Sequence, residues 1–156
     1  MKRFHAHVGV TDIEKSITFY SSLFGTPPAV VKPDYAKWML DDPRINFAVS
    51  QHEGAAKGIR HVGLQVEDKA ELAEVYSRLQ SADRPVLEEG ATTCCYAKSE
   101  KSWIADPDGV VWEAFLTEGE STTYGGGPNF DRLASSNAAS GACCEPQLAH
   151  ASSSCC

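Results

Sequence analysis

The 156-residue sequence has no apolar run of 18 or more residues and no cluster of basic residues. Without such a run we expect no membrane span, and His5, His7 and Asp12 interrupt the stretch where a signal peptide would need continuous apolar residues. The chain has 14 Lys and Arg against 21 Asp and Glu, a net charge of -7, which argues against binding to phosphate backbones. We therefore expect a cytoplasmic protein that binds neither membranes nor nucleic acid.

A disulfide framework is also missing, although the chain has six cysteines. They occur only as adjacent pairs, namely Cys94-Cys95, Cys143-Cys144 and Cys155-Cys156. Neighbouring cysteines can bridge only through a strained ring, and a reducing cytosol disfavours that bridge. Paired free thiols instead suggest a soft ligand.

Val and Ile are absent from Gly119 onward, where Gly and Ser are frequent. Such a segment cannot bury enough apolar area to offset the entropy of ordering it, so we predict a flexible tail over 119–156. The whole chain is 42% hydrophobic, which suffices for a core, and its length suits one domain. We place that domain at 2–118.

A weak internal repeat divides this domain. The segment from His5 to Asp12 aligns with the segment from His61 to Asp68. Alternating apolar residues predict a strand in each copy, with the leading His on the opposite face of that strand. Each Asp is placed to cap the start of a helix, and Glu71 supports the second cap.

Each copy continues with a predicted helix and about three strands. Helical spacing relates Ile13, Ile17, Tyr20 and Phe24 in the first half, and Leu72, Val75, Tyr76 and Leu79 in the second. Strand-like runs follow around 30, at 35–40 and 45–49, then around 86, 95 and 103, and at 110–116. The sequence therefore predicts an α+β fold of two βαβββ modules, about 3–50 and 59–117.

His5 and His61 hold equivalent places in the two modules, so they would converge if the modules curled their sheets around one cleft. Glu113 is an acidic residue in the otherwise apolar strand after the turn at 106–109. Burying an unpaired carboxylate costs roughly several kcal/mol, which favours a cation beside Glu113. Two imidazoles and a carboxylate are the set used for Fe(II), Mn, Ni, Co or Zn. The alternatives are ordinary core or surface histidines and an outward-facing Glu113.

The two His-to-Asp copies, the stretch SITFYSSLFG at 16–25 and the DPDG turn before Glu113 resemble the vicinal oxygen chelate superfamily, which includes glyoxalase I, extradiol dioxygenases and fosfomycin-resistance proteins. The resemblance covers 3–116. It implies paired βαβββ modules in a cupped mixed sheet, with a metal ion held inside by His5, His61 and Glu113. Glyoxalase I uses a fourth protein ligand where this chain offers Phe47 and Ala48, which argues against glyoxalase I itself.

The segment TTCCYAKS at 92–99 is similar to the substrate-binding loop of the organoarsenical carbon-arsenic lyases, and the cadmium-induced proteins share this pattern. This resemblance implies an Fe(II)-dependent dioxygenase that removes methyl or aryl groups from trivalent arsenic. The chemistry agrees, because a trivalent organoarsenical has two exchangeable positions that Cys94 and Cys95 can fill. The alternative is that the two cysteines alternate on a strand, with one buried as a small apolar residue.

We therefore expect Fe(II) at His5, His61 and Glu113, the organoarsenical at Cys94 and Cys95, and release of inorganic arsenite with dioxygen as co-substrate. One rival function is a noncatalytic protein that sequesters cadmium or arsenic. Another is a fosfomycin-resistance or glyoxalase-like metalloenzyme. The sequence does not choose between methyl and aryl arsenicals, between Fe and Mn, or between a cleft within one chain and one shared across a homodimer.

Further expectations concern side chains around this site. His7 is expected to support the site rather than to bind the metal ion. Lys98 and Lys101 are expected on a solvated loop, and the alternative is that they meet an anionic substituent of an aryl group. Four aromatic residues either line a pocket for an aryl group or pack in the core: Trp38, Tyr96, Trp103 and Trp112. The tail thiols Cys143, Cys144, Cys155 and Cys156 either capture arsenic and raise its local concentration or are inert.

Overall fold

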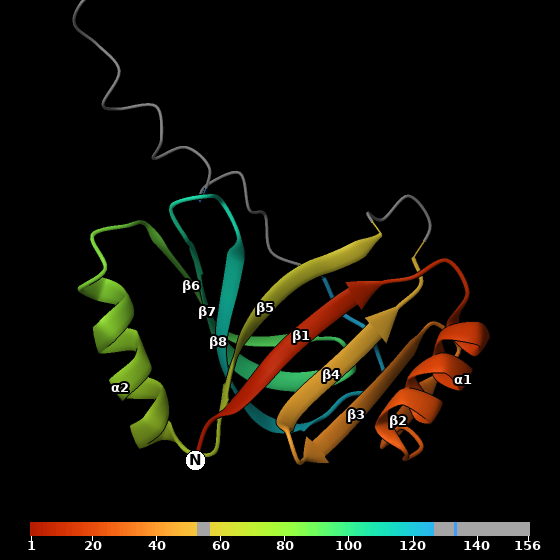
Figure 1. The fold of residues 1–156 in the computed structure, drawn as a ribbon. Coiled ribbons are helices and arrows are strands. Elements are labelled where there is room, and N and C mark those ends of the chain that lie inside the picture. The colour runs from red at the N-terminus through yellow and green to blue at the C-terminus, as the bar shows by residue number, and fades with distance from the viewer. Residues whose placement is uncertain (53–56, 127–132, 134–156) are drawn as a thin grey trace, which may run out of the picture.

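A computed structural model describes residues 1–52, 57–126 and 133 of the chain. Its elements are β1 (Arg3–Gly9), α1 (Ile13–Phe24), β2 (Val30–Lys32), β3 (Tyr35–Asp41), β4 (Arg44–Ser50), β5 (Gly58–Val66), α2 (Lys69–Gln80), β6 (Val86–Cys94), β7 (Ala97–Ala105) and β8 (Val111–Glu120). The order βαβββ thus occurs twice, as the sequence predicts (Figure 1).

All eight strands form one mixed sheet in the order β2-β3-β4-β1-β5-β8-β7-β6. The two modules meet where β1 runs antiparallel to β5, and on either side β4 is parallel to β1 and β8 is parallel to β5. The sheet curls into a half-barrel that the two helices flank (Figure 1). The predicted α+β fold with a cupped mixed sheet is therefore confirmed.

Both helices begin at the predicted caps. The Asp12 carboxylate accepts a hydrogen bond from the backbone N–H of Lys15 at 2.9 Å, and Asp68 accepts one from Glu71 at 2.8 Å. Gly25 ends α1 in the left-handed region, with φ 67°. In the described residues neither helix is long and apolar enough to cross a membrane.

Each helix packs on the sheet of its own module. The core against α1 contains Ile13, Ala36, Trp38, Leu40 and Val49, and the core against α2 contains Val66, Leu72, Val75, Ala114 and Leu116. On β1, Val8 packs toward α1, whereas the side chains of His5 and His7 alternate with it on the other face. The apolar residues thus occupy the helix side and leave the concave side to polar groups.

The chain continues to pack on the domain beyond β8. The backbone N–H of Ser121 donates to the Tyr96 carbonyl at 2.7 Å, and Gly125 forms an isolated β-bridge with Cys94. Leu133 is buried against Trp103. The first residues of the predicted flexible segment 119–156 therefore contact the turn that carries the thiols, and the rest of that segment lies outside the described residues.

Candidate functional site

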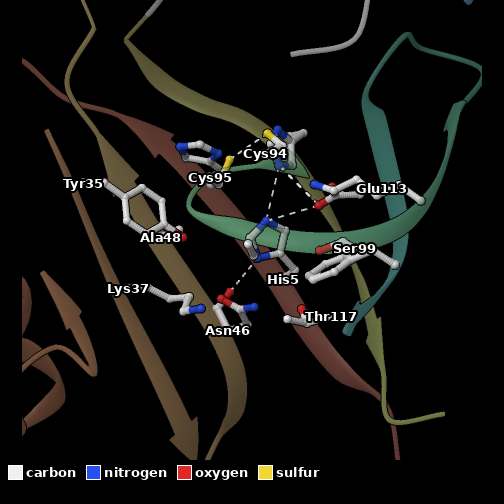
Figure 2. A pocket seen from close by; sticks show the side chains of 15 residues that line it. His5, Tyr35, Lys37, Asn46, Ala48, Cys94, Cys95, Ser99, Glu113 and Thr117 are labelled. Atoms are coloured by element: carbon white, nitrogen blue, oxygen red, sulfur yellow. Dashed lines mark hydrogen bonds and ion pairs between the residues drawn. The ribbon is translucent and has the colours of Figure 1, made fainter. Parts of the chain in front are cut away.

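His5, His61 and Glu113 converge on the concave face of the sheet, and Figure 2 shows His5 and Glu113 facing each other. Nε2 of His5 lies 3.2 Å from Nε2 of His61 and 3.5 Å from Oε2 of Glu113. Nε2 of His61 lies 3.6 Å from the same oxygen. The three ligand atoms lie within 4.8 Å of one another, close enough to share one metal ion, and a single chain supplies them all.

Strand pairing explains this convergence. His5 pairs with Gly63 across β1 and β5, and Gly63 pairs with Glu113 across β5 and β8. His5, Gly63 and Glu113 therefore form one row across the sheet, and His61 precedes Gly63 by two residues on β5. A Cβ atom at Gly63 would lie 2.3 Å from the backbone oxygen of Glu113. Glycine at this position therefore allows β8 to approach and leaves the space between imidazole and carboxylate open.

Hydrogen bonds to neighbouring groups orient the side chains of His5 and Glu113. Nδ1 of His5 donates to the backbone oxygen of Asn46 at 2.9 Å, so the lone pair of the neutral ring lies on Nε2 and faces the site. Nζ of Lys101 lies 2.6 Å from Oε1 of Glu113, which leaves Oε2 facing the imidazoles. This orientation suits metal binding.

The protonation states also suit a metal ion. Burial lowers the pKa of His5 to about 4, against the opposite pull of Glu113. Burial acts to raise the pKa of Glu113, but Lys101 and the two histidines outweigh it and hold that pKa below its usual range. Near neutral pH the site therefore presents a neutral His5 and an ionised Glu113, the forms that coordinate metals.

His7 lies on the same face as His5 but is committed elsewhere. Its Nε2 lies 2.8 Å from Oγ of Ser50, and its ring packs edge-on against the ring of His61 at 5.0 Å between centroids. His7 therefore supports the orientation of His61 without joining the cluster of ligand atoms.

Ala48 occupies the place of a fourth ligand. Glu113 lies opposite Gly63, two residues after His61, and Ala48 lies opposite His7, two residues after His5. The internal repeat thus makes Ala48 the counterpart of Glu113, and its methyl side chain has no ligand atom. This register explains why the strand with Phe47 and Ala48 offers no fourth protein ligand, as the sequence predicts.

Cys94 and Cys95 lie at the turn between β6 and β7. Cys94 ends β6 and Ala97 begins β7, so Cys95 and Tyr96 alone form the connection, with φ 56° and 61°. Two successive left-handed residues match a type I′ hairpin turn, which usually contains Asn-Gly. The turn places the two Sγ atoms 3.0 Å apart, so the two cysteines do not alternate along a strand. Cys94, at the end of β6, is nevertheless buried, as the alternative expected of one cysteine.

The two thiols differ in acidity. The hydrogen bond from Cys95 lowers the pKa of Cys94, whereas the same hydrogen bond, together with burial, raises the pKa of Cys95. The pair therefore favours one thiolate, on Cys94, beside one thiol. A thiolate is the form that attacks a soft electrophile.

One cavity of about 30 Å³ joins the thiol pair to the histidine-glutamate cluster (Figure 2). Its wall is completed by His7, Tyr35, Lys37, Asn46, Ala48, Ala97, Ser99, Lys101, Phe115 and Thr117. The two features predicted from separate parts of the sequence thus face the same small space.

The expected solvated position of Lys101 is wrong, whereas for the aromatic residues Trp38 and Trp103 the alternative of core packing holds. Lys101 is only 5% exposed and paired with Glu113, because β7 pairs with β8 and turns this side chain inward, whereas Lys98 on the same strand is exposed. In the described structure none of the four predicted aromatic residues lines the cavity. Trp38 packs in the core under α1, and Tyr35 and Phe115 line the cavity instead.

Tyr124 is a contact of the thiol pair that sequence reasoning missed, because its surroundings have the composition of a tail. Its ring lies 4.1 Å from the ring of His52 and 5.7 Å from that of Tyr96. Burial and the Cys95 thiol raise the pKa of Tyr124. The remaining thiols Cys143, Cys144, Cys155 and Cys156 lie outside the described residues, and their role stays a prediction.

A cupped sheet of two βαβββ modules, with two histidines and a glutamate on its concave face, defines the vicinal oxygen chelate class. The sequence profile of the Glyoxalase/Bleomycin resistance protein/Dioxygenase superfamily matches residues 2–114. The chain therefore belongs to that superfamily.

Sequence relatives narrow the comparison. The chain is 46% identical over 122 residues to the trivalent organoarsenical cleaving enzyme of Bacillus sp. (strain MD1), covering 76% of this chain and 74% of that one. It is 34% identical over 148 residues to the enzyme of the same name from Thermomonospora curvata, covering 94% and 91%. It is 33% identical over 149 residues to the cadmium-induced protein CadI of Mycobacterium bovis, covering 96% and 97%.

Solved structures support the fold. The Mn(II)-bound glyoxalase of Novosphingobium aromaticivorans superposes with a TM-score of 0.55 at 14% identity, over 84% of this chain and 44% of that one. A methylmalonyl-CoA epimerase of Streptomyces coelicolor superposes with a TM-score of 0.52 at 14% identity, over 76% and 96%. At such low identity these likenesses concern the fold alone.

Proposed function

We propose that this protein cleaves the carbon–arsenic bond of trivalent organoarsenicals as an Fe(II)-dependent dioxygenase and releases arsenite. The observation that carries the proposal is the pair of Sγ atoms of Cys94 and Cys95, 3.0 Å apart, on the wall of the cavity that holds His5, His61 and Glu113. The names of relatives at 46% and 34% identity support the substrate class.

The thiol pair would hold the arsenic. A trivalent organoarsenical with two hydroxyl groups exchanges both for sulfur. One thiol, one thiolate and one proton taken up from solution give two As–S bonds and two molecules of water. Two sulfur atoms as close as those of Cys94 and Cys95 can share one arsenic atom. The organic group then remains free to enter the cavity toward the metal ligands.

His5, His61 and Glu113 would hold Fe(II), and their orientation and protonation fit that ion. When bound, Fe(II) would supply the activation of dioxygen that oxidation of the carbon requires. Lys101 fixes the carboxylate through its other oxygen. Phe115 and Tyr35 give the cavity an aromatic wall.

The overall reaction balances without a further reductant. For the methyl compound, CH3As(OH)2 and O2 give As(OH)3 and CH2O. The methyl carbon loses four electrons, which dioxygen accepts, and arsenic stays trivalent. The reaction therefore predicts equal amounts of dioxygen consumed, arsenite released and formaldehyde formed.

The test is anaerobic loading with Fe(II), addition of the trivalent methylarsenical and admission of air, while all three quantities are followed. We expect one equivalent of each, and no arsenite from a Cys94→Ser variant that still carries iron. Tight binding of the arsenical with neither dioxygen uptake nor arsenite release would contradict a lyase. That result would favour a protein that sequesters arsenic or cadmium.

A further inference from the structure

Lys37 on β3 brings a positive charge to the cavity wall that no acidic side chain neutralises directly. Among the described residues its ammonium forms no ion pair and no hydrogen bond. Burial lowers its pKa, and Glu120 acts in the opposite direction without reaching ion-pair distance. Lys101, the other lysine on the wall, is already paired with Glu113. Because a half-buried unpaired ammonium is costly, Lys37 is poised to bind an anion.

Asn46 adds an unsatisfied acceptor to the same wall. Its side chain is 3% exposed, and Oδ1 has no hydrogen-bond partner. Its amide nitrogen is occupied, because it donates to Gln65 at 3.0 Å. Lys37 pairs with Ala48, and Asn46 lies two residues from Ala48 on the same face of β4, so Lys37 and Asn46 are diagonal neighbours within reach of each other's ligand.

Lys37 and Asn46 lie across His5 from the thiols, and Lys37 is still near enough to Cys95 for the two side chains to interact electrostatically. Figure 2 shows Cys94 and Cys95 on one side of His5 and shows Lys37 and Asn46 on the other. A second cavity of about 60 Å³ shares Lys37 and Cys95 with the first, so Lys37 lies where the two cavities meet. An organic group that starts at arsenic on the thiols and passes the metal ligands is directed toward this corner.

We propose that Lys37 and Asn46 form a subsite for an acidic or hydroxyl substituent on the ring of an arylarsenical. This inference rests on the proposed function, since the thiol pair must hold the arsenic. The ammonium of Lys37 binds a carboxylate or phenolate, and Oδ1 of Asn46 accepts a hydrogen bond from a hydroxyl. A methyl group carries no charge or hydroxyl group for these residues to bind, so the subsite selects substituted aryl compounds by charge.

The test is anaerobic titration calorimetry of reduced, metal-free protein with two probes, a trivalent phenylarsenical and its 4-carboxyphenyl analogue. The full chain carries C143S, C144S, C155S and C156S, so that Cys94 and Cys95 alone bind arsenic. We expect the carboxylated probe to bind about tenfold more tightly. Lys37→Met should abolish this preference and leave the affinity for the phenyl probe unchanged, whereas Lys98→Met, at an exposed lysine of β7, should preserve it.

A cationic probe distinguishes the loss of the Lys37 charge from a general destabilisation of the Lys37→Met variant. The 4-aminomethylphenyl compound should bind more tightly to Lys37→Met than to the parent protein, which a destabilised variant would not show. Equal affinity of the parent protein for the phenyl and carboxyphenyl probes would overturn the subsite and leave the arsenic site standing. So would equal weakening of both probes by Lys37→Met. Failure of the parent protein to bind either probe would instead contradict the proposed function.

Discussion

Nζ of Lys101 lies 2.6 Å from Oε1 of Glu113, and this contact leaves only Oε2 facing His5 and His61. Both partners are almost fully buried, at 5% and 3% exposure. A buried charge is tolerated only while its partner is present. The candidate metal ligand Glu113 is therefore held in place by the pairing of β7 with β8 even without a metal ion.

Lys101→Met should destabilise the metal-free protein strongly, because it leaves the buried Glu113 carboxylate without its cation. We expect a loss of about 3–5 kcal/mol in the free energy of unfolding, measured by urea titration with a chelator present. Lys98→Met on the same strand is the control and should change it by less than about 0.5 kcal/mol. Equal effects of the two variants would contradict the coupling.

His5 and His7 provide a matched pair for testing the metal site. His5→Ala removes an imidazole whose Nε2 faces His61 and Glu113, so metal affinity should fall at least about 100-fold. His7→Gln retains an amide that can donate to or accept from Ser50, and it should lower affinity by less than about tenfold. Titration with Co(II), followed by its absorption, measures both. Loss of binding in His7→Gln alone would reassign the ligand.

Much of the fold could be predicted from local sequence patterns. The repeated His-to-Asp segments fix two strands and two capped helices, because period-two and helical spacing act within a few residues of each other. The same repeat suggested that His5 and His61 converge, since equivalent strands in paired modules lie side by side. Prediction was strongest where the interaction is local or duplicated.

The contacts that complete the site depend on strand register and leave no local signal. Gly63 matters because it lies between His5 and Glu113 in one row, and Lys101 turns inward because β7 pairs with β8. The Cys95 and Tyr96 turn lacks the Gly or Asn that usually marks two left-handed residues. Tyr124 was missed because the prediction of a flexible tail used the composition of the whole segment, which does not show that a single side chain within it packs on the domain.

Gly125→Ala should detach the segment that covers the thiol turn. A Cβ at Gly125 would lie 1.8 Å from the backbone oxygen of Thr93, and φ is 78°. We expect the Ser121 amide to lose protection from hydrogen exchange and the Cys95 thiol to alkylate several-fold faster. Gly126→Ala, where a Cβ meets nothing within 4 Å, is the control. Unchanged protection of the Ser121 amide in Gly125→Ala would contradict the close packing.

Cys94→Ser and Cys95→Ser should separate arsenic binding from iron binding. In a chain that also carries C143S, C144S, C155S and C156S, each variant leaves one sulfur for an arsenic atom with two exchangeable positions. Affinity for a trivalent methylarsenical should therefore fall at least about 100-fold. Iron content should stay at the level of the parent protein, because no ligand atom of His5, His61 or Glu113 is removed. Calorimetry and metal analysis measure the two properties. Loss of iron in either variant would refute this division of roles.

The stability of the metal-free protein should depend on pH through His5. Its pKa is about 4 in the folded protein and about 6.5 when unfolded, so between these values the unfolded chain binds more protons. The free energy of unfolding therefore rises with pH across this window. The contribution of His5 is fully present above pH 6.5, and about 3 kcal/mol of it is lost as the pH falls to 4. The lowered pKa of His7 acts in the same direction, and that of Glu113 contributes only below about pH 4.5.

Urea titrations from pH 8 to pH 4.5 with a chelator present measure this slope. His5→Gln replaces the imidazole at position 5 with a side chain that does not titrate. The free energy of unfolding of this variant should therefore fall less steeply with decreasing pH than that of the parent protein. A bound metal ion should steepen the loss, because protons compete for the same imidazole nitrogen. An identical slope in His5→Gln and the parent protein would show that His5 is not held neutral by burial, and the preorganised neutral ligand would then have to be abandoned.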